Sequence, residues 1–363
     1  MESFSQKKLT RRSVLVAAAA GAFVNALPVG PANIAHAAFQ KPVPYGVAVE
    51  LKHFRNDPQF RENLIRHADL IVPMNALKWA SLRYDRNGFD FSGADELMEF
   101  AERNGKSTHG HALLWYHANP KWLDAITSPR ELERLLIEHI ETVVGRYAGR
   151  IPTWDVVNEV VAHNPLNEGK WRSGVWYNGL GPRHVDLAFE VAARTDPKAR
   201  LFVNDYDLED DSLRTEARQK AILQIIQRLQ DKNIPVHGVG FQAHLYAERA
   251  IGHDALGRFL DELKVLGVEA AVTELDVIDW KLSADPQIRD QAVARTVSDF
   301  LSAFEGHAVP RNITTWGMQD TQSWIGDTFP RKDSAQARPL PFDADWNRKP
   351  FFDVLQRFTR GES

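Results

Sequence analysis

Two glutamates in this sequence each follow a short, mostly apolar run. Glu159 comes directly after residues 154–158, and Glu274 comes directly after residues 270–273. If both runs are strands that end at one edge of a sheet, the two carboxylates face each other across a single cleft. Such a pair can cleave an acetal, because one carboxyl protonates the leaving oxygen while the other stabilises or captures the oxocarbenium-like carbon.

Eight short apolar runs, which alternate with longer segments of helical period, are the elements that must position these glutamates. The runs cover residues 46–50, 70–75, 108–115, 153–159, 201–206, 238–245, 270–277 and 312–318. Apolar residues between them recur at spacings of three and four, which is typical of helices with one buried face. Eight strand–helix units predict an α/β fold, a single (β/α)8 TIM barrel. An open doubly wound sheet is disfavoured, because no Gly-rich phosphate turn follows the first run.

Polar and aromatic residues gather at the C-terminal ends of these runs, which is where TIM barrels carry their chemistry. They are Asn75, Lys78, His111, Trp115, Asn158, Glu159, Tyr206, Gln242, His244, Glu274, Asp276 and Trp316. We expect them to line one mouth of the barrel.

Composition excludes several function classes. The chain has 363 residues, of which 44% are hydrophobic and 25% charged, as in ordinary globular proteins. The absence of cysteine excludes disulfides, thiol nucleophiles and Cys-ligated metal sites. A net charge of −4 without a basic stripe argues against nucleic acid as a partner.

The first 37 residues have the pattern of a signal peptide. Basic residues 7–12 precede a small-residue apolar stretch at 14–27, and Ala35-His36-Ala37 forms an A-x-A cleavage site. The pair Arg11-Arg12 is similar to a twin-arginine export signal. The apolar stretch is shorter than the roughly 20 residues that span a membrane. We therefore expect an exported protein, periplasmic or extracellular, with no membrane contact after signal removal and a catalytic barrel over residues 38–363.

Ordered motifs along the remaining chain resemble glycoside hydrolase family 10, the retaining endo-β-1,4-xylanases. Asn158-Glu159 is similar to the acid/base motif, and Thr273-Glu274-Leu275-Asp276 to the nucleophile motif. The other matching segments are Asn75-Ala76-Leu77-Lys78-Trp79, Gly110-His111-Ala112-Leu113-Leu114-Trp115, Trp171-Arg172-Ser173, Asn204-Asp205-Tyr206, Gly240-Phe241-Gln242-Ala243-His244-Leu245, Trp316-Gly317 and Arg338-Pro339-Leu340-Pro341-Phe342-Asp343.

The resemblance implies a role for each residue of the reacting centre. Glu159 is the expected general acid and then general base, and Glu274 the nucleophile that forms a glycosyl-enzyme, with the carboxyls about 5–5.5 Å apart. Asn158 is expected to hydrogen-bond the sugar 2-hydroxyl. His244 is expected to hold Glu274 and to be oriented in turn by Asp276.

The resemblance also implies a set of residues that bind the sugar chain of xylan or xylo-oligosaccharides. Lys78, His111 and Gln242 are expected at the sugar next to the scissile bond, with further contacts from Asn75 and Trp115. Trp316 and Trp324 are expected on the glycone side, and Tyr206 on the aglycone side. The resemblance implies no metal or organic cofactor, and a monomer is the family's usual state.

Four positions depart from the family pattern. Met74 stands where an acidic residue is usual, Tyr116 where a His is usual, Ala118 where a Gln is usual and Asp207 where an Asn is usual. We interpret these changes as a cluster on the glycone and cleft-floor side. They predict altered glycone subsites, with a preference for decorated or short xylan chains or a relaxed specificity that includes mixed-linkage β-glucan.

Two alternatives come from other classes. His109 and His111 form an H-x-H pattern on one face of a strand, as in metal-dependent amidohydrolase barrels, although there the pattern lies on the first strand. A non-catalytic carbohydrate-binding barrel is the second alternative. Such proteins typically lack one catalytic carboxylate, whereas Glu159 and Glu274 are both present here.

Overall fold

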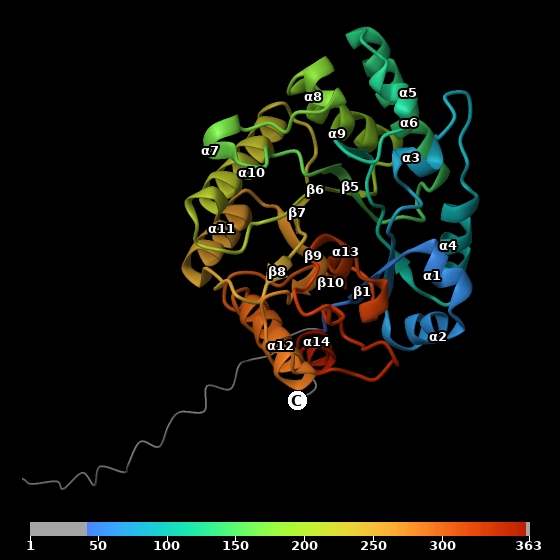
Figure 1. The fold of residues 1–363 in the computed structure, drawn as a ribbon. Coiled ribbons are helices and arrows are strands. Elements are labelled where there is room, and N and C mark those ends of the chain that lie inside the picture. The colour runs from blue at the N-terminus through green and yellow to red at the C-terminus, as the bar shows by residue number, and fades with distance from the viewer. Residues whose placement is uncertain (1–41, 361–363) are drawn as a thin grey trace, which may run out of the picture. The chain divides into compact units, whose positions relative to one another are not determined.

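The computed structural model describes residues 42–360, and these form a parallel β-barrel surrounded by helices (Figure 1). The predicted signal peptide, residues 1–37, lies outside the described residues. The first strand of the barrel begins at Tyr45. The strands are β1 (Tyr45–Val49), β2 (Leu70–Pro73), β3 (Ser107–Thr108), β4 (Leu114–Trp115), β5 (Thr153–Asn158), β6 (Arg200–Asp205), β7 (Gly238–Phe241), β8 (His244–Tyr246), β9 (Glu269–Ile278) and β10 (Ile313–Thr315).

The sheet closes on itself through the segment 107–115. Neighbouring strands follow the order β3-β2-β1-β10-β9-β7-β6-β5-β4, and β3 and β4 are two ends of that one segment. The backbone N–H of His109 donates to Ile71 O in β2 at 3.1 Å, whereas the next N–H, of Gly110, donates to Thr153 O in β5 at 2.9 Å. The prediction of a single (β/α)8 barrel is confirmed.

Two of the eight predicted strands are each divided into two shorter strands, so the prediction of single strands there is wrong. Segment 108–115 is divided into β3 and β4, because its pairing changes from β2 to β5 at Gly110, whose backbone runs against the Trp154 ring. Segment 238–245 is divided into β7 and β8 at Ala243, which adopts a left-handed φ of 57°. After this turn, β8 pairs with the far end of β9 and extends the wall above the barrel mouth.

The longer helices lie outside the strands (Figure 1). Their buried apolar residues belong to the same cluster as those of the strands. The longer ones are α2 (Pro58–His67), α4 (Ser92–Arg103), α6 (Pro129–Arg146), α9 (Arg183–Thr195), α10 (Leu213–Asp231), α11 (His253–Val265), α12 (Pro286–Ser302) and α14 (Pro350–Arg360). The shorter ones are α1 (Leu51–Asn56), α3 (Trp79–Leu82), α5 (Lys121–Asp124), α7 (Pro165–Glu168), α8 (Val175–Leu180), α13 (Ile325–Thr328) and the 3-10 turn η1 (Asp320–Gln322).

Local sequence explains where several helices begin. At α2, α6 and α12 a side chain accepts from the first-turn N–H groups and a proline follows it: Asp57 before Pro58, Ser128 before Pro129 and Asp285 before Pro286. Proline suits the first helical position because its missing N–H has no partner there in any case. Among residues 42–360, no helix meets the length and apolarity needed to cross a bilayer.

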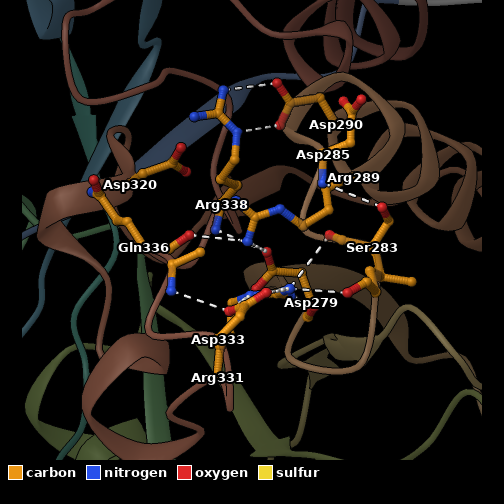
Figure 2. Close-up of polar contacts among 12 residues, drawn as sticks. Asp279, Ser283, Asp285, Arg289, Asp290, Asp320, Arg331, Asp333, Gln336 and Arg338 are labelled. Atoms are coloured by element: carbon orange, nitrogen blue, oxygen red, sulfur yellow. Dashed lines mark hydrogen bonds and ion pairs between the residues drawn. The ribbon is translucent and has the colours of Figure 1, made fainter.

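A buried charged cluster holds the long segment between β10 and α14 against the barrel (Figure 2). Asp279, one residue past β9, accepts at Oδ2 from Arg289 Nη1 at 3.2 Å and from the backbone N–H of Arg338 at 3.1 Å. Arg331 Nη1 donates to Asp279 O at 2.6 Å, and the Arg338 guanidinium makes two bonds of 2.7 Å to Asp290. We call these five residues the Asp279 cluster. They fix the segment that carries Trp324.

Candidate active site

One large cleft opens at the C-terminal ends of the strands. Its volume is about 1040 Å³. Eleven of the thirteen residues predicted to form the site line it: Lys78, His111, Trp115, Asn158, Glu159, Tyr206, Gln242, His244, Glu274, Trp316 and Trp324. The other two, Asn75 and Asp276, hydrogen-bond residues of this lining.

Glu159 lies at the turn that follows β5. Its φ of 54° is in the left-handed region, and its backbone N–H donates to Asn204 O at 2.8 Å, so the turn is held by the neighbouring strand β6. Gln242 Nε2 donates to Glu159 Oε1 at 3.3 Å. Burial, together with the negative charges of Asp205 and Glu274, raises the pKa of Glu159 to about 7. Glu159 therefore holds a proton at mildly acidic pH.

Glu274 lies within β9 and is held at both carboxylate oxygens. Asn204 Nδ2 donates to Oε1 at 2.7 Å, and His244 Nε2 lies 3.3 Å from Oε2. Burial opposes ionisation of Glu274, but the charges of His111, His244 and Lys78 outweigh it and lower the pKa below its ordinary value. The two glutamates of one cleft thus have opposite pKa shifts.

His244 connects Glu274 to a second buried carboxylate. Its Nδ1 lies 2.8 Å from Asp276 Oδ1, while Trp324 Nε1 donates to Asp276 Oδ2 at 2.8 Å. Burial disfavours the protonated imidazole, but Asp276 and Glu274 prevail and raise the pKa of His244 well above its ordinary value. A protonated His244 donates to both carboxylates, so Asp276 orients His244 and Trp324 together.

Lys78 is buried at the edge of the cleft between two indole rings. Its Nζ lies 4.6 Å from the ring centroid of Trp115 and 5.6 Å from that of Trp316. Asn75 Oδ1 accepts from Lys78 Nζ at 3.0 Å, and Asn75 Nδ2 donates to Glu50 at 2.5 Å. Asn75 is itself exposed and contacts the cleft through Lys78.

The H-x-H pair shares one carboxylate. His109 Nε2 and His111 Nδ1 each lie 2.9 Å from a different oxygen of Asp155, which is buried in β5. Burial would raise the pKa of Asp155, but the two imidazoles lower it to about 2. Residues 42–360 contain no cluster of three His, Cys, Asp or Glu side chains arranged to hold a metal ion. Asp155 thus holds the His111 ring, whose Nδ1 lies 3.9 Å from Glu274 Oε1.

Tyr206, at the end of β6, is held by two polar neighbours. Arg172 Nη2 donates to its hydroxyl at 2.5 Å, and His163 Nδ1 lies 2.9 Å from the same oxygen. The Arg172 guanidinium also lies 4.7 Å from the Tyr116 ring centroid. Asp207, the next residue along the chain, pairs with Arg214.

The interpretation of the four departures as one cluster is wrong. Met74 packs in the small apolar cluster with Trp316 and Trp324. Tyr116 and Asp207 instead lie around Tyr206, because Arg172 and the turn after β6 bring them together there. Met74 and the pair Tyr116 and Asp207 therefore lie among different neighbours.

Asn204 is the functional residue that sequence reasoning missed. In the sequence it stands out only as part of the motif Asn204-Asp205-Tyr206, yet its amide joins Asn158, Glu274 and Thr273 in one hydrogen-bond network. Its place one residue before Asp205, at the end of an apolar run, was the available signal. Asp155 was missed for a different reason, since a carboxylate in mid-strand gives no sign of two histidine partners on another strand.

A TIM barrel with a proton-bearing glutamate and an ionised glutamate at the same mouth is the architecture of a glycoside hydrolase. The model of glycosyl hydrolase family 10 matches residues 33–357 of this chain, and the chain belongs to that family.

Known relatives agree with this assignment. The chain is 34% identical over 310 residues to a beta-1,4-xylanase of Dictyoglomus thermophilum, covering 81% of this chain and 84% of that protein. It is 33% identical to endo-1,4-beta-xylanase 2 of Claviceps purpurea, covering 84% of each. Among solved structures, xylanase 10B of Thermotoga petrophila in complex with xylobiose matches with a TM-score of 0.80, 29% identity and coverage of 88% and 94%.

Proposed function

We propose that this protein hydrolyses the β-1,4-xylosidic bonds of xylan or xylo-oligosaccharides with retention of configuration, as an endo-1,4-xylanase. The observation that carries the proposal is the opposite pKa shift of Glu159 and Glu274 in one cleft. An acid that keeps its proton near neutral pH and a carboxylate that stays ionised are the two groups that double displacement needs. Family membership and relatives named as xylanases support the substrate.

In the first step, Glu274 attacks the anomeric carbon while Glu159 gives its proton to the leaving oxygen. The bond from carbon to the leaving sugar breaks, and a glycosyl ester of Glu274 forms. Esterification removes the negative charge of Glu274, one of the charges that hold the pKa of Glu159 high. The pKa of Glu159 falls as a result, so Glu159 stays ionised and can act as the general base. It takes a proton from a water molecule while the water oxygen bonds to the anomeric carbon, and the bond from that carbon to Glu274 breaks.

The remaining cleft residues are assigned to substrate binding. Asn158 is held by Asn204 at 2.9 Å and by Gln242 at 3.1 Å, which presents its amide for the sugar 2-hydroxyl. Lys78, His111 and Gln242 surround the sugar next to the scissile bond. The indoles of Trp316 and Trp324 form the glycone side, and Tyr206 lines the aglycone side. His244 keeps Glu274 ionised rather than reacting itself.

The test is a product profile of the purified protein on xylan, arabinoxylan, xylo-oligosaccharides and mixed-linkage β-glucan. Xylo-oligosaccharides of retained anomeric configuration, seen by NMR during the first turnovers, are expected from the unmodified protein. The Glu274→Gln variant keeps the side-chain shape but has no nucleophile, so its products should disappear. Release from the variant equal to that of the unmodified protein, or cleavage of β-glucan alone, would contradict the proposal.

We propose in addition that the protein is exported through the twin-arginine route and acts as a monomer in the periplasm or outside the cell. The pattern of residues 7–37 supports export. Replacing Arg11 and Arg12 together by lysine is expected to retain the protein in the cytoplasm, as fractionation would report. Light scattering of the purified protein tests the monomer.

A further inference from the structure

Arg249 lines the cleft, and its guanidinium is the feature from which this inference starts. It follows β8 in a turn closed by its own backbone N–H, which donates to Tyr246 O at 2.9 Å. The guanidinium carbon lies 3.6 Å from the centroid of the Tyr246 ring, so the cation lies against the aromatic face. Its side chain is 43% exposed and lines the same cleft as Glu159 and Glu274.

The neighbouring cation, Arg214, is already used within the protein. Arg214 pairs closely with Asp207 and reaches His163 O at 3.5 Å. Arg249, in contrast, reaches Asp207 Oδ1 only at 3.9 Å, an ion-pair distance without a hydrogen bond. Among the described residues, no oxygen accepts a hydrogen bond from its guanidinium. The N–H donors of Arg249 are therefore available to a bound molecule.

The acidic residues near Arg249 leave no large excess of negative charge that would repel a bound anion. Asp207 is compensated by Arg214, and Asp210 is held by Ser212 and Thr215 on the α10 side. Glu209 is buried, and burial with the charge of Asp207 raises its pKa to about 8, so it is neutral at neutral pH. The fixed charges are thus near balance, and binding of an anion at this place rests on the directed donors of Arg249.

We propose that Arg249, supported on the Tyr246 ring, binds the carboxylate of a uronic acid branch carried by a xylan chain on the aglycone side of the cleft. The planar fork of a guanidinium matches the two oxygens of a carboxylate, and the Tyr246 ring holds the guanidinium in place from one side. The place is beside Asp207, which follows the aglycone-side Tyr206. The inference rests on the proposed xylanase function and names the class of xylan that the enzyme prefers.

The test compares two substrates that differ only in charge. One is a xylo-oligosaccharide with a single glucuronic acid branch, and the other is the same molecule after reduction of the carboxyl to a primary alcohol. The measured quantity is the ratio of kcat/KM for the acidic over the reduced substrate, with the branch located in the products by mass spectrometry. Linear xylohexaose is measured in parallel and reports on the xylanase activity itself.

The unmodified protein is expected to favour the acidic substrate by about three- to tenfold at low salt, because a charged, partly exposed hydrogen-bonded pair contributes in that range. In Arg249→Gln the ratio should fall to about one, and in Arg249→Glu below one. Arg258→Gln removes the same charge from an exposed position on α11 outside the cleft lining, so it should keep the ratio of the unmodified protein. Added salt should reduce the ratio only where Arg249 is present.

A ratio of one in the unmodified protein would overturn the proposal, as would a ratio that Arg249→Gln leaves unchanged or a branch recovered on the glycone-side product. Failure to cleave linear xylohexaose would instead contradict the proposed function. In that case, calorimetric binding of the acidic and reduced oligosaccharides to the unmodified protein and to Arg249→Gln still decides the Arg249 site. Equal affinities there would overturn it.

Discussion

The side-chain amide of Asn204 donates to both Glu274 Oε1, at 2.7 Å, and Asn158 Oδ1, at 2.9 Å. One residue at the end of β6 thereby sets the position of a carboxylate on β9 and of an amide on β5. Its own amide oxygen is fixed by Thr273, whose hydroxyl donates to it at 2.7 Å. Asn204 cannot rotate without losing one of these bonds, so it holds the two glutamate-bearing strands in register at the cleft floor.

Replacing Asn204 by alanine is therefore expected to lower kcat more than it raises KM. Loss of a hydrogen bond to a charged group costs about 1.5–3 kcal/mol, which corresponds to a roughly 10- to 100-fold fall in rate. Steady-state kinetics on xylohexaose measure both constants. Thr273→Val removes only the bond to the Asn204 oxygen and should have a smaller effect; an Asn204→Ala variant with unchanged kcat would show that the network does not position Glu274.

The pH dependence of kcat/KM should be bell-shaped. The alkaline side is expected to fall through about pH 7, because Glu159 must carry its proton and its pKa is raised to about 7. The midpoint of the acidic limb is expected to lie below pH 4.5, the ordinary pKa of a glutamate, because Glu274 must be ionised and its pKa is lowered. Arg172 lowers the pKa of Glu159, so Arg172→Gln should move the alkaline limb upward; a downward shift would contradict this assignment.

Asp276→Asn should change the acidic limb. Without the Asp276 charge, the raised pKa of His244 falls and the imidazole loses its proton more readily. Glu274 then loses a neighbouring cation, and its pKa rises. The acidic limb of kcat/KM is expected to move to higher pH, while a purely structural defect would lower the whole profile without moving it. Thermal unfolding of the same variant shows whether the fold is intact.

Arg331→Ala should loosen the segment that carries Trp324. Arg331 donates to the backbone oxygens of Asp279 and Leu282, at 2.6 and 2.9 Å, and its removal leaves both without this charged donor. The free energy of unfolding is expected to fall by about 1.5–3 kcal/mol. KM for xylohexaose should rise more than kcat falls, because Trp324 is proposed to bind sugar rather than to react. Arg295→Ala on the exposed side of α12 is the matched control and should change neither quantity.

Met74→Glu tests the glycone side. Met74 packs with Trp316 and Trp324, so an acidic side chain there can reach the sugars that these indoles contact. We expect KM to fall by about three- to tenfold for oligosaccharides long enough to fill this side, and little change for shorter ones. Met74→Gln introduces a side chain of the same shape as glutamate but without its charge, so the comparison of the two variants separates hydrogen bonding from charge. Equal rates of variant and unmodified protein at every chain length would count against altered glycone subsites.

Much of this protein was predictable from the sequence, because strands and their ends are local features. Apolar runs of five to eight residues identified most barrel strands. The polar and aromatic residues at or near the ends of these runs included Glu159, Glu274 and eight further residues of the cleft lining, while Trp324 came from the family resemblance. The motifs around the two glutamates are contiguous, so they pointed to the family without a structure.

Tertiary structure decided the features that depend on residues far apart in the chain. The link from Asn204 to Glu274 spans 70 positions, and that from Asp155 to His111 spans 44. The place of Asp207 beside Arg214 and Arg249 is revealed neither by its own neighbours in the sequence nor by the spacing of apolar residues. Periodicity reports only which face of an element is buried. Which side chains meet across the barrel mouth is set by how the strands pair and close, and this is a property of the folded chain.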